Sequence, residues 1–204
     1  MKTITSLFNI FLSAIEFIIL YCLGKIFGIS QIVRYLRNPN PLITSKLLRA
    51  FGSSIGEKVT FKGCLFFDNV YEDENSKGDL SFLEIGNNCY IGDGVYFDLS
   101  NQICIKDDVV ISGKVSIITH SDCNRSEELA QKFPRKCAPV IINKGSWLCF
   151  QSTVLAGTQV GEYSVLASHS LLKSDTKPRS VCVGIPARYL NDTQKQDIRE
   201  KEIE

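Results

Sequence analysis

The chain has 204 residues, of which 44% are hydrophobic and 10% aromatic, and 23 Lys and Arg against 22 Asp and Glu leave a net charge of +1. This length suits one or two domains with a sizeable core. The near-neutral charge argues against nucleic acid as a partner, because such binding usually requires a basic excess. A charged fraction of 22% alongside these aromatics also argues against general disorder.

The cysteine content is unusual beside only two histidines and one methionine. The eight cysteines contain no CxxC pair and no tight cluster, so a structural zinc site is not expected. In a secreted domain, eight cysteines would suggest disulfides. In a cytosolic protein they would be reduced and mostly buried, and would act as small apolar residues. Composition leaves both interpretations open for Cys22, Cys64, Cys89, Cys104, Cys123, Cys137, Cys149 and Cys182.

The first 50 residues form an expected helical segment with a strongly apolar start. Residues 4–29 are apolar apart from a few positions, and Glu16 interrupts the run. This makes it a poor membrane-spanning helix by length and charge and a poor signal peptide. Thr5, Asn9, Ser13 and Glu16 recur at helical spacing, which gathers them into one narrow polar stripe.

A basic segment follows, because no acidic residue occurs between Phe17 and Gly56. An apolar helix next to basic residues suits the cytoplasmic face of an anionic membrane, at about 1 kcal/mol per basic residue near the surface. Packing of the helix on the protein or on a second subunit is the alternative. Pro39 and Pro41 break the chain, and Ser45 is expected to cap a short helix that runs to about Phe51.

The most informative pattern is an aliphatic residue at every sixth position, with a serine or threonine four residues after each. Helices repeat near 3.6 residues and strands near 2.0, so a strict six fits neither alone. Three short strands per turn of a coil produce such a period, with the aliphatic residue inside and the small residue beside a corner. The aliphatic set is Ile142, Leu148, Val154, Val160, Leu166 and Leu172, and the small set is Ser146, Ser152, Thr158, Ser164, Ser170 and Thr176.

The same phase occurs earlier in the chain, where one corner between Phe97 and Ile105 holds about two extra residues. The pattern therefore predicts a parallel β-helix, in which similar coils stack into one continuous core. The earlier inward positions are Ile55, Phe61, Ile85, Ile91, Phe97, Ile105, Ile111 and Ile117.

Three motifs within this repeat resemble those of the hexapeptide-repeat acyltransferases. They are Ile-Gly-Asp-Gly-Val-Tyr at 91–96, Val-Gly-Glu-Tyr-Ser-Val at 160–165 and Val-Gly-Ile-Pro-Ala-Arg at 183–188. The resemblance covers about residues 45–190 and implies an all-β fold, a left-handed parallel β-helix. The amino-terminal helical segment, expected from the apolar run at residues 4–29, is not part of the family's core motif. Three regions follow: helical residues 1–50, a β-helix acyltransferase domain at 51–190, and a charged tail at 191–204.

The resemblance also implies an activity: transfer of an acetyl group from acetyl-CoA to a sugar hydroxyl, in capsule, O-antigen or exopolysaccharide biosynthesis. Acetylation of an antibiotic and a non-catalytic β-helix scaffold are the alternatives. A zinc-dependent β-helix enzyme would need three histidines, and the chain has two, so no metal is expected. The resemblance further implies a homotrimer with active sites between subunits. The acceptor is expected to be a sugar or a lipid-linked saccharide at the cytoplasmic face of the membrane.

Two segments leave the six-residue phase. The first, 72–80, is acidic and is expected to be solvated; the second, 119–139, has His120 at its root. Loops ejected from a rigid stack often carry function, and acyl transfer to a hydroxyl needs a base, a role that suits histidine. We predict His120 as that base. Many relatives have a second histidine nearby, but Ser121 and Asp122 follow here.

The repeat also indicates which residues lie next to His120. One coil is about 18 residues and the long corner adds two, so His120 is expected to stack over Ser100. Asp98 and Asn101 then lie about one strand spacing away, about 4.8 Å. Each is a candidate to orient the imidazole or to bind the acceptor, and simple turn hydrogen bonds are the alternative.

The resemblance assigns a set of residues to the acetyl-CoA site. Lys173 and Arg188 supply cations, which a diphosphate and a ribose phosphate require in any fold. Solvated surface charge and aromatic packing are the alternatives. His169, in place of a family glycine, is expected to have a structural or channel-lining role. The predicted cofactor set is Trp147, Phe150, Ser168, Lys173, Ser174 and Arg188. A CoA-dependent reaction favours reduced cysteines in a cytoplasmic protein.

Overall fold

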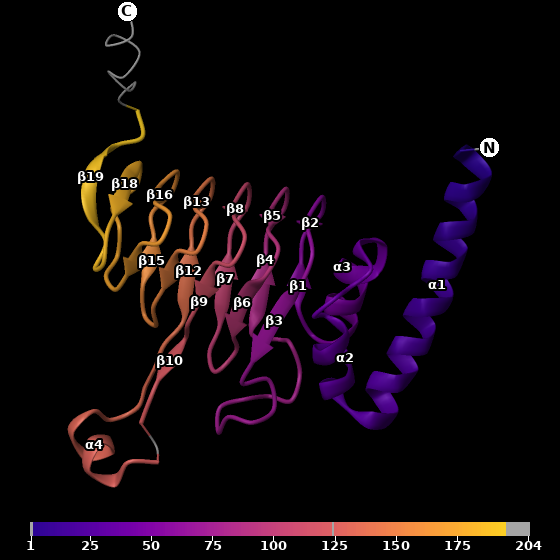
Figure 1. Ribbon diagram of the computed structural model, residues 1–204, viewed down its shortest axis with the longest axis horizontal. Coiled ribbons are helices and arrows are strands. Elements are labelled where there is room, and N and C mark those ends of the chain that lie inside the picture. Colours follow the sequence, from indigo (N-terminus) through magenta and orange to yellow (C-terminus); the bar gives the residue numbers. More distant parts are fainter. Residues whose placement is uncertain (1, 124, 195–204) are drawn as a thin grey trace, which may run out of the picture.

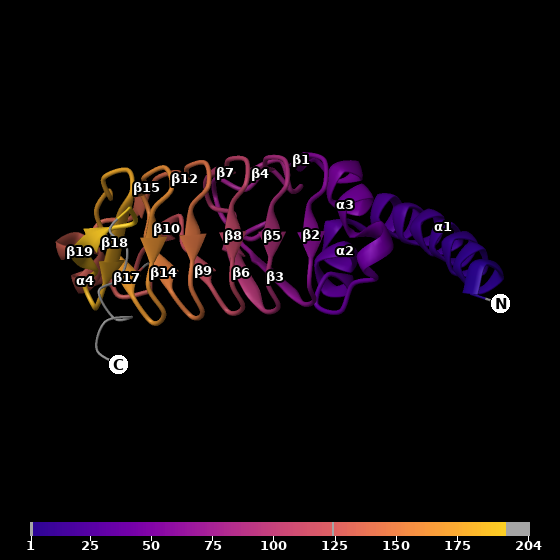
Figure 2. The ribbon, with the colours of Figure 1, turned by 90° about the horizontal axis from the view of Figure 1, so that it is seen from above.

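The computed structural model describes residues 2–123 and 125–194, with side chains from residue 8 onward, as a coil of short strands with helices at one end (Figure 1). The helices come first: α1 (Lys2–Phe27), α2 (Ile29–Tyr35) and α3 (Pro41–Ala50). From above, α2 and α3 lie between α1 and the first coil (Figure 2). α2 buries Ile32 and Val33, and α3 buries Leu47 and Leu48, in the core that continues through the coil, so the two helices close its amino-terminal end.

Two expectations for this segment need correction. First, α3 begins at Pro41, not at Ser45: the Asn40 side chain accepts a hydrogen bond from the Leu42 N–H at 3.0 Å, and proline suits the first helical position because it lacks the unpaired N–H. Second, the helix Phe8–Phe27 is long and apolar enough to cross a membrane, and 11% of it is buried. Glu16 does not exclude it, since Glu16 and Lys25 are its only charged residues.

Each turn of the coil contributes one strand to each of three faces, and successive turns pair in parallel. Face one contains β1 (Ser54–Ile55), β4 (Leu83–Ile85), β7 (Ile103–Ile105), β12 (Val140–Ile142) and β15 (Gln159–Val160). Face two contains β2 (Thr60–Phe61), β5 (Tyr90–Ile91), β8 (Val110–Ile111), β13 (Trp147–Leu148), β16 (Val165–Leu166) and β18 (Ser180–Val183). Face three contains β3 (Leu65–Asp68), β6 (Val95–Asp98), β9 (Ser116–Ile117), β14 (Thr153–Val154) and β17 (Leu171–Leu172).

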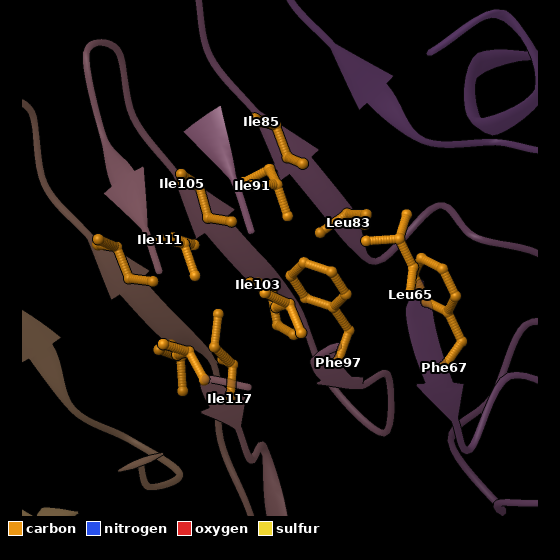
Figure 3. Close-up of a cluster of buried hydrophobic side chains, with 14 of the residues drawn as sticks. Leu65, Phe67, Leu83, Ile85, Ile91, Phe97, Ile103, Ile105, Ile111 and Ile117 are labelled. Atoms are coloured by element: carbon orange, nitrogen blue, oxygen red, sulfur yellow. The ribbon is translucent and has the colours of Figure 1, made fainter. Parts of the chain in front are cut away.

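The six-residue period is confirmed as the inward-facing set of this coil. All six aliphatic residues from Ile142 to Leu172 are at most 1% exposed, and the earlier isoleucines and Phe97 point into the same core (Figure 3). The small residues satisfy backbone groups at the corners: Ser146 Oγ donates to the Gly161 carbonyl at 2.8 Å and Thr158 Oγ1 to the Leu155 carbonyl at 2.7 Å. A hydroxyl at these positions therefore donates a hydrogen bond to a corner carbonyl that has no partner in the short strands.

The loop at 119–139 is an arm that projects from the coil (Figure 1). It consists of β10 (His120–Ser121), α4 (Glu127–Lys132) and β11 (Lys136–Cys137), with β10 and β11 antiparallel. At the other end, β19 (Arg188–Asp192) folds back antiparallel on β18. The predicted charged tail at 191–204 therefore begins inside a strand, and its residues 195–204 lie outside the described residues.

The eight cysteines are all free thiols, so the disulfide alternative is not what the structure contains. Cys89, Cys149 and Cys182 are buried. Burial raises the pKa of the Cys89 and Cys149 thiols, which keeps them protonated and unreactive. These residues act as small apolar components of the repeat.

Candidate active site

His120 lies at the corner between faces three and one, where the chain leaves β9 for the arm. Phe97 of β6 pairs with Ile117 of β9, which is the twenty-residue offset that the sequence predicts. The end of β6 therefore lies directly beneath the start of the arm. This register brings the buried side chain of Asp98 to His120.

Asp98 holds the imidazole in one orientation. Its Oδ2 lies 2.6 Å from His120 Nδ1 and accepts hydrogen bonds from the backbone N–H groups of Thr119 and His120, at 2.8 and 2.9 Å. Burial opposes ionisation of Asp98, but the hydrogen bonds from His120, Asn69 and Thr119 outweigh it and lower the pKa of this carboxyl below its ordinary value. An ionised carboxylate only accepts, so Nδ1 carries a proton toward Asp98; in the neutral imidazole the free lone pair is then on Nε2.

Asn69 completes this arrangement, although the six-residue pattern does not predict it. β3 pairs with β6 so that Asp68 lies beside Asp98, and Asn69 follows in a left-handed conformation with φ of 57°. Its Nδ2 donates to Asp98 Oδ1 at 2.8 Å and lies 3.5 Å from His120 Nδ1. In the sequence, Asn69 directly follows a strand with inward-facing residues. The insertion at 72–80 makes this turn of the coil twelve residues longer than a regular one, so the repeat does not indicate that Asn69 lies beside Asp98.

Asn101, the other candidate to orient His120, makes different contacts. Its backbone N–H donates to Thr119 Oγ1 at 3.0 Å, and its side-chain amide nitrogen lies 3.5 Å from Cys137 Sγ. Asn101 therefore fastens the base of the arm. Of the two candidates, the structure brings only Asp98 to the imidazole within the described residues. The Asp98 side chain is 1% exposed, so its contacts are with His120 and the surrounding protein groups and not with solvent.

The His120 side chain is partly exposed and lines a groove of about 680 Å³ between the arm and the coil. Lys173, a predicted cofactor residue, lines the same groove from the end of β17. Ser174 and Arg188, two further predicted residues, line a second cavity of about 560 Å³ at the end of the coil, together with Lys177. Three of the six predicted cofactor residues thus line cavities at the carboxyl-terminal end of the coil, and one of these shares the groove with His120.

The other three predicted residues lie on a different side of the coil. Trp147 projects from face two, where its Nε1 donates to Ser112 Oγ at 3.0 Å. Phe150 and Ser168 lie at the corner between faces two and three, and the Phe150 ring stands edge-on to His169 with centroids 6.1 Å apart. In a three-sided coil, face two is opposite the corner that carries His120. One copy of the chain therefore does not bring these three residues into the His120 groove.

Arg135 ties the two excursions together. From the arm it pairs with Asp73 at 2.7 Å, Asp122 at 3.2 Å and Glu74 at 3.2 Å. The Asp73 side chain is only 6% exposed, and although burial opposes ionisation, hydrogen bonds from Asn75 and Arg135 lower the pKa of its carboxyl. The expectation that segment 72–80 is fully solvated is therefore wrong at Asp73, because the arm covers it.

Within residues 2–123 and 125–194, no group of three or more His, Cys, Asp or Glu side chains is placed to hold a metal ion. The chemistry that the described groove offers is that of an oriented imidazole with one free nitrogen, next to lysine and arginine side chains.

No protein-family model matches the chain. Among curated proteins, it is 26% identical over 146 residues to the Escherichia coli K12 protein named "Putative colanic acid biosynthesis acetyltransferase WcaF", covering 72% of each chain. It is 24% identical over 123 residues to the galactoside O-acetyltransferase of the same strain, covering 57% of this chain and 60% of that one.

Solved structures share the fold. A hexapeptide-repeat acetyltransferase from Vibrio cholerae in complex with acetyl-CoA matches with a TM-score of 0.67 at 19% identity, covering 81% of this chain and 85% of that one. A galactoside acetyltransferase in complex with CoA matches with a TM-score of 0.66 at 20% identity, covering 84% and 80%. The six-residue repeat, the three-faced coil and these relatives agree: the chain is similar in sequence and in fold to the hexapeptide-repeat acetyltransferases.

Proposed function

We propose that this acyltransferase moves an acetyl group from acetyl-CoA to a hydroxyl of a saccharide, with His120 as the general base. The observation that carries the proposal is the His120–Asp98 pair at 2.6 Å in a groove that also contains Lys173. Relatives named for colanic acid biosynthesis and for galactoside acetylation support a sugar as the acceptor. The left-handed sense of the coil and a role in assembling a surface polysaccharide are parts of the same proposal.

The proposed step begins with an acceptor hydroxyl hydrogen-bonded to His120 Nε2. As the hydroxyl oxygen attacks the thioester carbonyl carbon, Nε2 takes its proton, and Asp98 stabilises the imidazolium through Nδ1. The new carbon–oxygen bond forms while the carbon–sulfur bond breaks. The imidazolium then gives the proton to the departing thiolate, so that the histidine returns to its starting state.

Acetyl-CoA fits the groups at the carboxyl-terminal end of the coil. Its phosphates require cations, and Lys173 lines the groove while Lys177 and Arg188 line the next cavity along the chain. Ser174 follows Lys173 in the chain and lines this second cavity, so it is a proposed contact of the same substrate.

Trp147, Phe150 and Ser168 are proposed to act from a neighbouring copy. They lie on the side of the coil away from His120, so they serve the site only if another subunit lays its face two beside the groove. This is the support for a homotrimer, in which each site lies between two subunits. A mass in solution of three times the 22.8 kDa chain is expected, and a monomeric mass would contradict this part of the proposal.

The test of the activity is thiol release from acetyl-CoA in the presence of free sugars, nucleotide sugars, lipid-linked saccharides or chloramphenicol. A saccharide is expected to be acetylated, and His120→Ala is expected to lose about 10²–10⁴-fold in kcat because the base is gone. Circular dichroism and the unfolding midpoint of the variant check that the coil is intact. Undiminished transfer by a folded H120A variant would refute the mechanism, and turnover of chloramphenicol alone would indicate an antibiotic acetyltransferase.

The remaining proposals concern location. Acetyl-CoA is a cytosolic substrate, so the enzyme is proposed to act in the cytoplasm. The apolar and basic residues of the amino-terminal 50 are proposed to contact the inner face of the membrane, where lipid-linked saccharides would be met.

A further inference from the structure

Helix α1 faces the protein with its polar stripe and solvent with its apolar side. Glu16 accepts hydrogen bonds from the Tyr35 hydroxyl at 2.7 Å and from Asn40 Nδ2 at 2.6 Å, and Asn40 Nδ2 also contacts Ser13 Oγ at 3.1 Å. The polar residues that would normally face water are thus fixed against α2 and the start of α3. Asn9 of the same stripe is exposed, and the Thr5 side chain lies outside those described.

The outward side of α1 is almost entirely apolar. Phe11 is 62% exposed, Ile18 60% and Ile26 72%, and the helix stands at the end of the molecule away from the coil (Figure 1). A surface helix of a soluble protein has the opposite arrangement, with the apolar stripe packed on the core. Contiguous exposed apolar surface of this kind marks an interaction site. The other exposed apolar residues of this helix are Phe8, Ile10, Leu12, Ile15, Ile19, Tyr21, Leu23 and Phe27.

The charges next to this surface have one sign. No acidic residue lies between Phe17 and Gly56. Exposed cations of this part of the chain include Lys25 on α1, Arg34 on α2, Arg37 just after α2 and Lys46 on α3. We propose that α1 docks on an anionic lipid membrane, with its apolar side in the acyl region and these cations at the headgroups. Apolar burial together with attraction between cations and anionic headgroups is the known basis of such binding.

The contacts of α1 indicate that it lies along the membrane surface and does not cross the bilayer. Ser13 and Glu16, near its middle, are hydrogen-bonded to residues outside the helix, and a Cβ at Gly24 would lie 2.3 Å from Phe51 Cζ. The helix is therefore held against α2 and α3 at two places, and both of these helices pack on the coil. A crossing helix would bring Tyr35 and Asn40 into the hydrocarbon with it.

A groove between α1 and α3 fits this arrangement. It has a volume of about 440 Å³ and is lined mainly by apolar side chains, among them Ile10, Phe17 and Leu42, with Lys46 at one side. An acyl chain whose anionic headgroup meets Lys46 matches this lining. The inference depends on α1 and its neighbours, so it is independent of the acetyl transfer proposed for His120.

The test is co-sedimentation of the full-length chain with vesicles of phosphatidylcholine, alone or mixed with phosphatidylglycerol. Tighter binding to the mixed vesicles is expected, falling as salt is raised. The double variant Phe11→Ser/Ile18→Ser is expected to weaken this binding at least about tenfold, because each side chain buries a large apolar area in lipid. The triple variant Lys25→Gln/Arg34→Gln/Lys46→Gln is expected to lose the preference for phosphatidylglycerol.

The matched control is Leu190→Ser, which removes a similarly exposed apolar residue, 59% exposed, at the opposite end of the coil. It should bind vesicles like the unmodified chain. The proposal is overturned if the unmodified chain stays in the supernatant with every vesicle, or if L190S loses as much binding as the α1 variant. A smaller oligomer on F11S/I18S without lipid would also overturn it, because α1 would then pack against a second copy. Thiol release from acetyl-CoA by the same variants keeps this result separate from the proposed activity.

Discussion

At the residue scale, the candidate site depends on a carboxylate that is held from three sides. The Asp98 carboxylate accepts hydrogen bonds from the His120 ring, from the Asn69 amide and from three backbone N–H groups, those of Ser100, Thr119 and His120. Each of these donors favours the charged form of Asp98, and the charged form fixes the histidine proton on Nδ1. The free nitrogen of His120 is therefore a consequence of contacts that come from three different coils.

Asn69 provides a prediction at this scale, because one substitution can remove its hydrogen bond to Asp98 and leave its turn conformation in place. Asn69→Gly keeps the left-handed turn, with φ of 57°, but removes the donor to Asp98. We expect kcat to fall about tenfold, the effect of losing one hydrogen bond to a charged group, with little change in KM.

The control is Asn88→Gly, since Asn88 has φ of 56° and donates to Asp108 at 2.8 Å at another corner. Steady-state kinetics and urea unfolding of both variants check the prediction. Equal losses of kcat in the two variants would show that the turn, and not the bond to Asp98, carries the effect.

At the element scale, the arm projects from the coil, so the packing of repeated inward residues does not stabilise it. Helix α4 buries none of its residues, and the arm meets the rest of the chain through its root and through Arg135. The three carboxylates around Arg135 come from both excursions. This ion cluster, rather than apolar packing, fixes one wall of the groove.

Arg135→Met tests this clasp. This substitution leaves the nearly buried Asp73 carboxylate without its cationic partner and removes charge-assisted hydrogen bonds worth about 1.5–3 kcal/mol. The amide hydrogens of the arm are therefore expected to exchange at least about tenfold faster. We also expect a higher KM for the acceptor. Hydrogen–deuterium exchange by mass spectrometry and acetyl-transfer kinetics measure these effects.

Lys132→Ala on the same arm is the control, because Lys132 pairs only with exposed Glu128 in the described structure, and such surface pairs contribute little. Equal exchange rates in R135M and the unmodified chain would mean that the arm is held by something other than Arg135.

At the scale of the whole molecule, stability comes from one row of inward side chains that runs through every coil. Each coil contacts mainly its neighbours, so the core is continuous but narrow. The two helices α2 and α3 cover one end, and the β18–β19 hairpin covers the other. Inward and outward residues on the same face should therefore differ sharply in their effect on stability.

Ile142→Ala and Gln159→Ala form the corresponding test on the paired strands β12 and β15. Ile142 is fully buried, so its truncation is expected to lower the free energy of unfolding by about 2–5 kcal/mol. Gln159 is exposed, so its truncation should change it by no more than about 0.5 kcal/mol. Denaturant unfolding at one fixed protein concentration measures both, since assembly would shift the midpoint. Similar values for the two variants would contradict the assignment of inward and outward positions.

The sequence by itself determined the coil, because a six-residue period has one simple structural source and each inward residue repeats the signal. It also located His120, whose place at the root of an ejected loop is visible in one dimension, and the offset that brings Asp98 beneath it. The polar stripe at Ser13 and Glu16 was likewise visible, but not the direction in which it faces.

Only the tertiary structure decided which partners those residues have. Asn69 reaches Asp98 across an insertion that breaks the period, and Arg135 meets Asp73 through two loops that carry no repeat. The side of the coil on which Trp147, Phe150 and Ser168 lie follows from the closing of three faces. The outward apolar side of α1 was settled by hydrogen bonds to Tyr35 and Asn40. For Asn69, Arg135 and α1 the deciding contact joins segments that are distant in the sequence, and no local pattern encodes which of them meet.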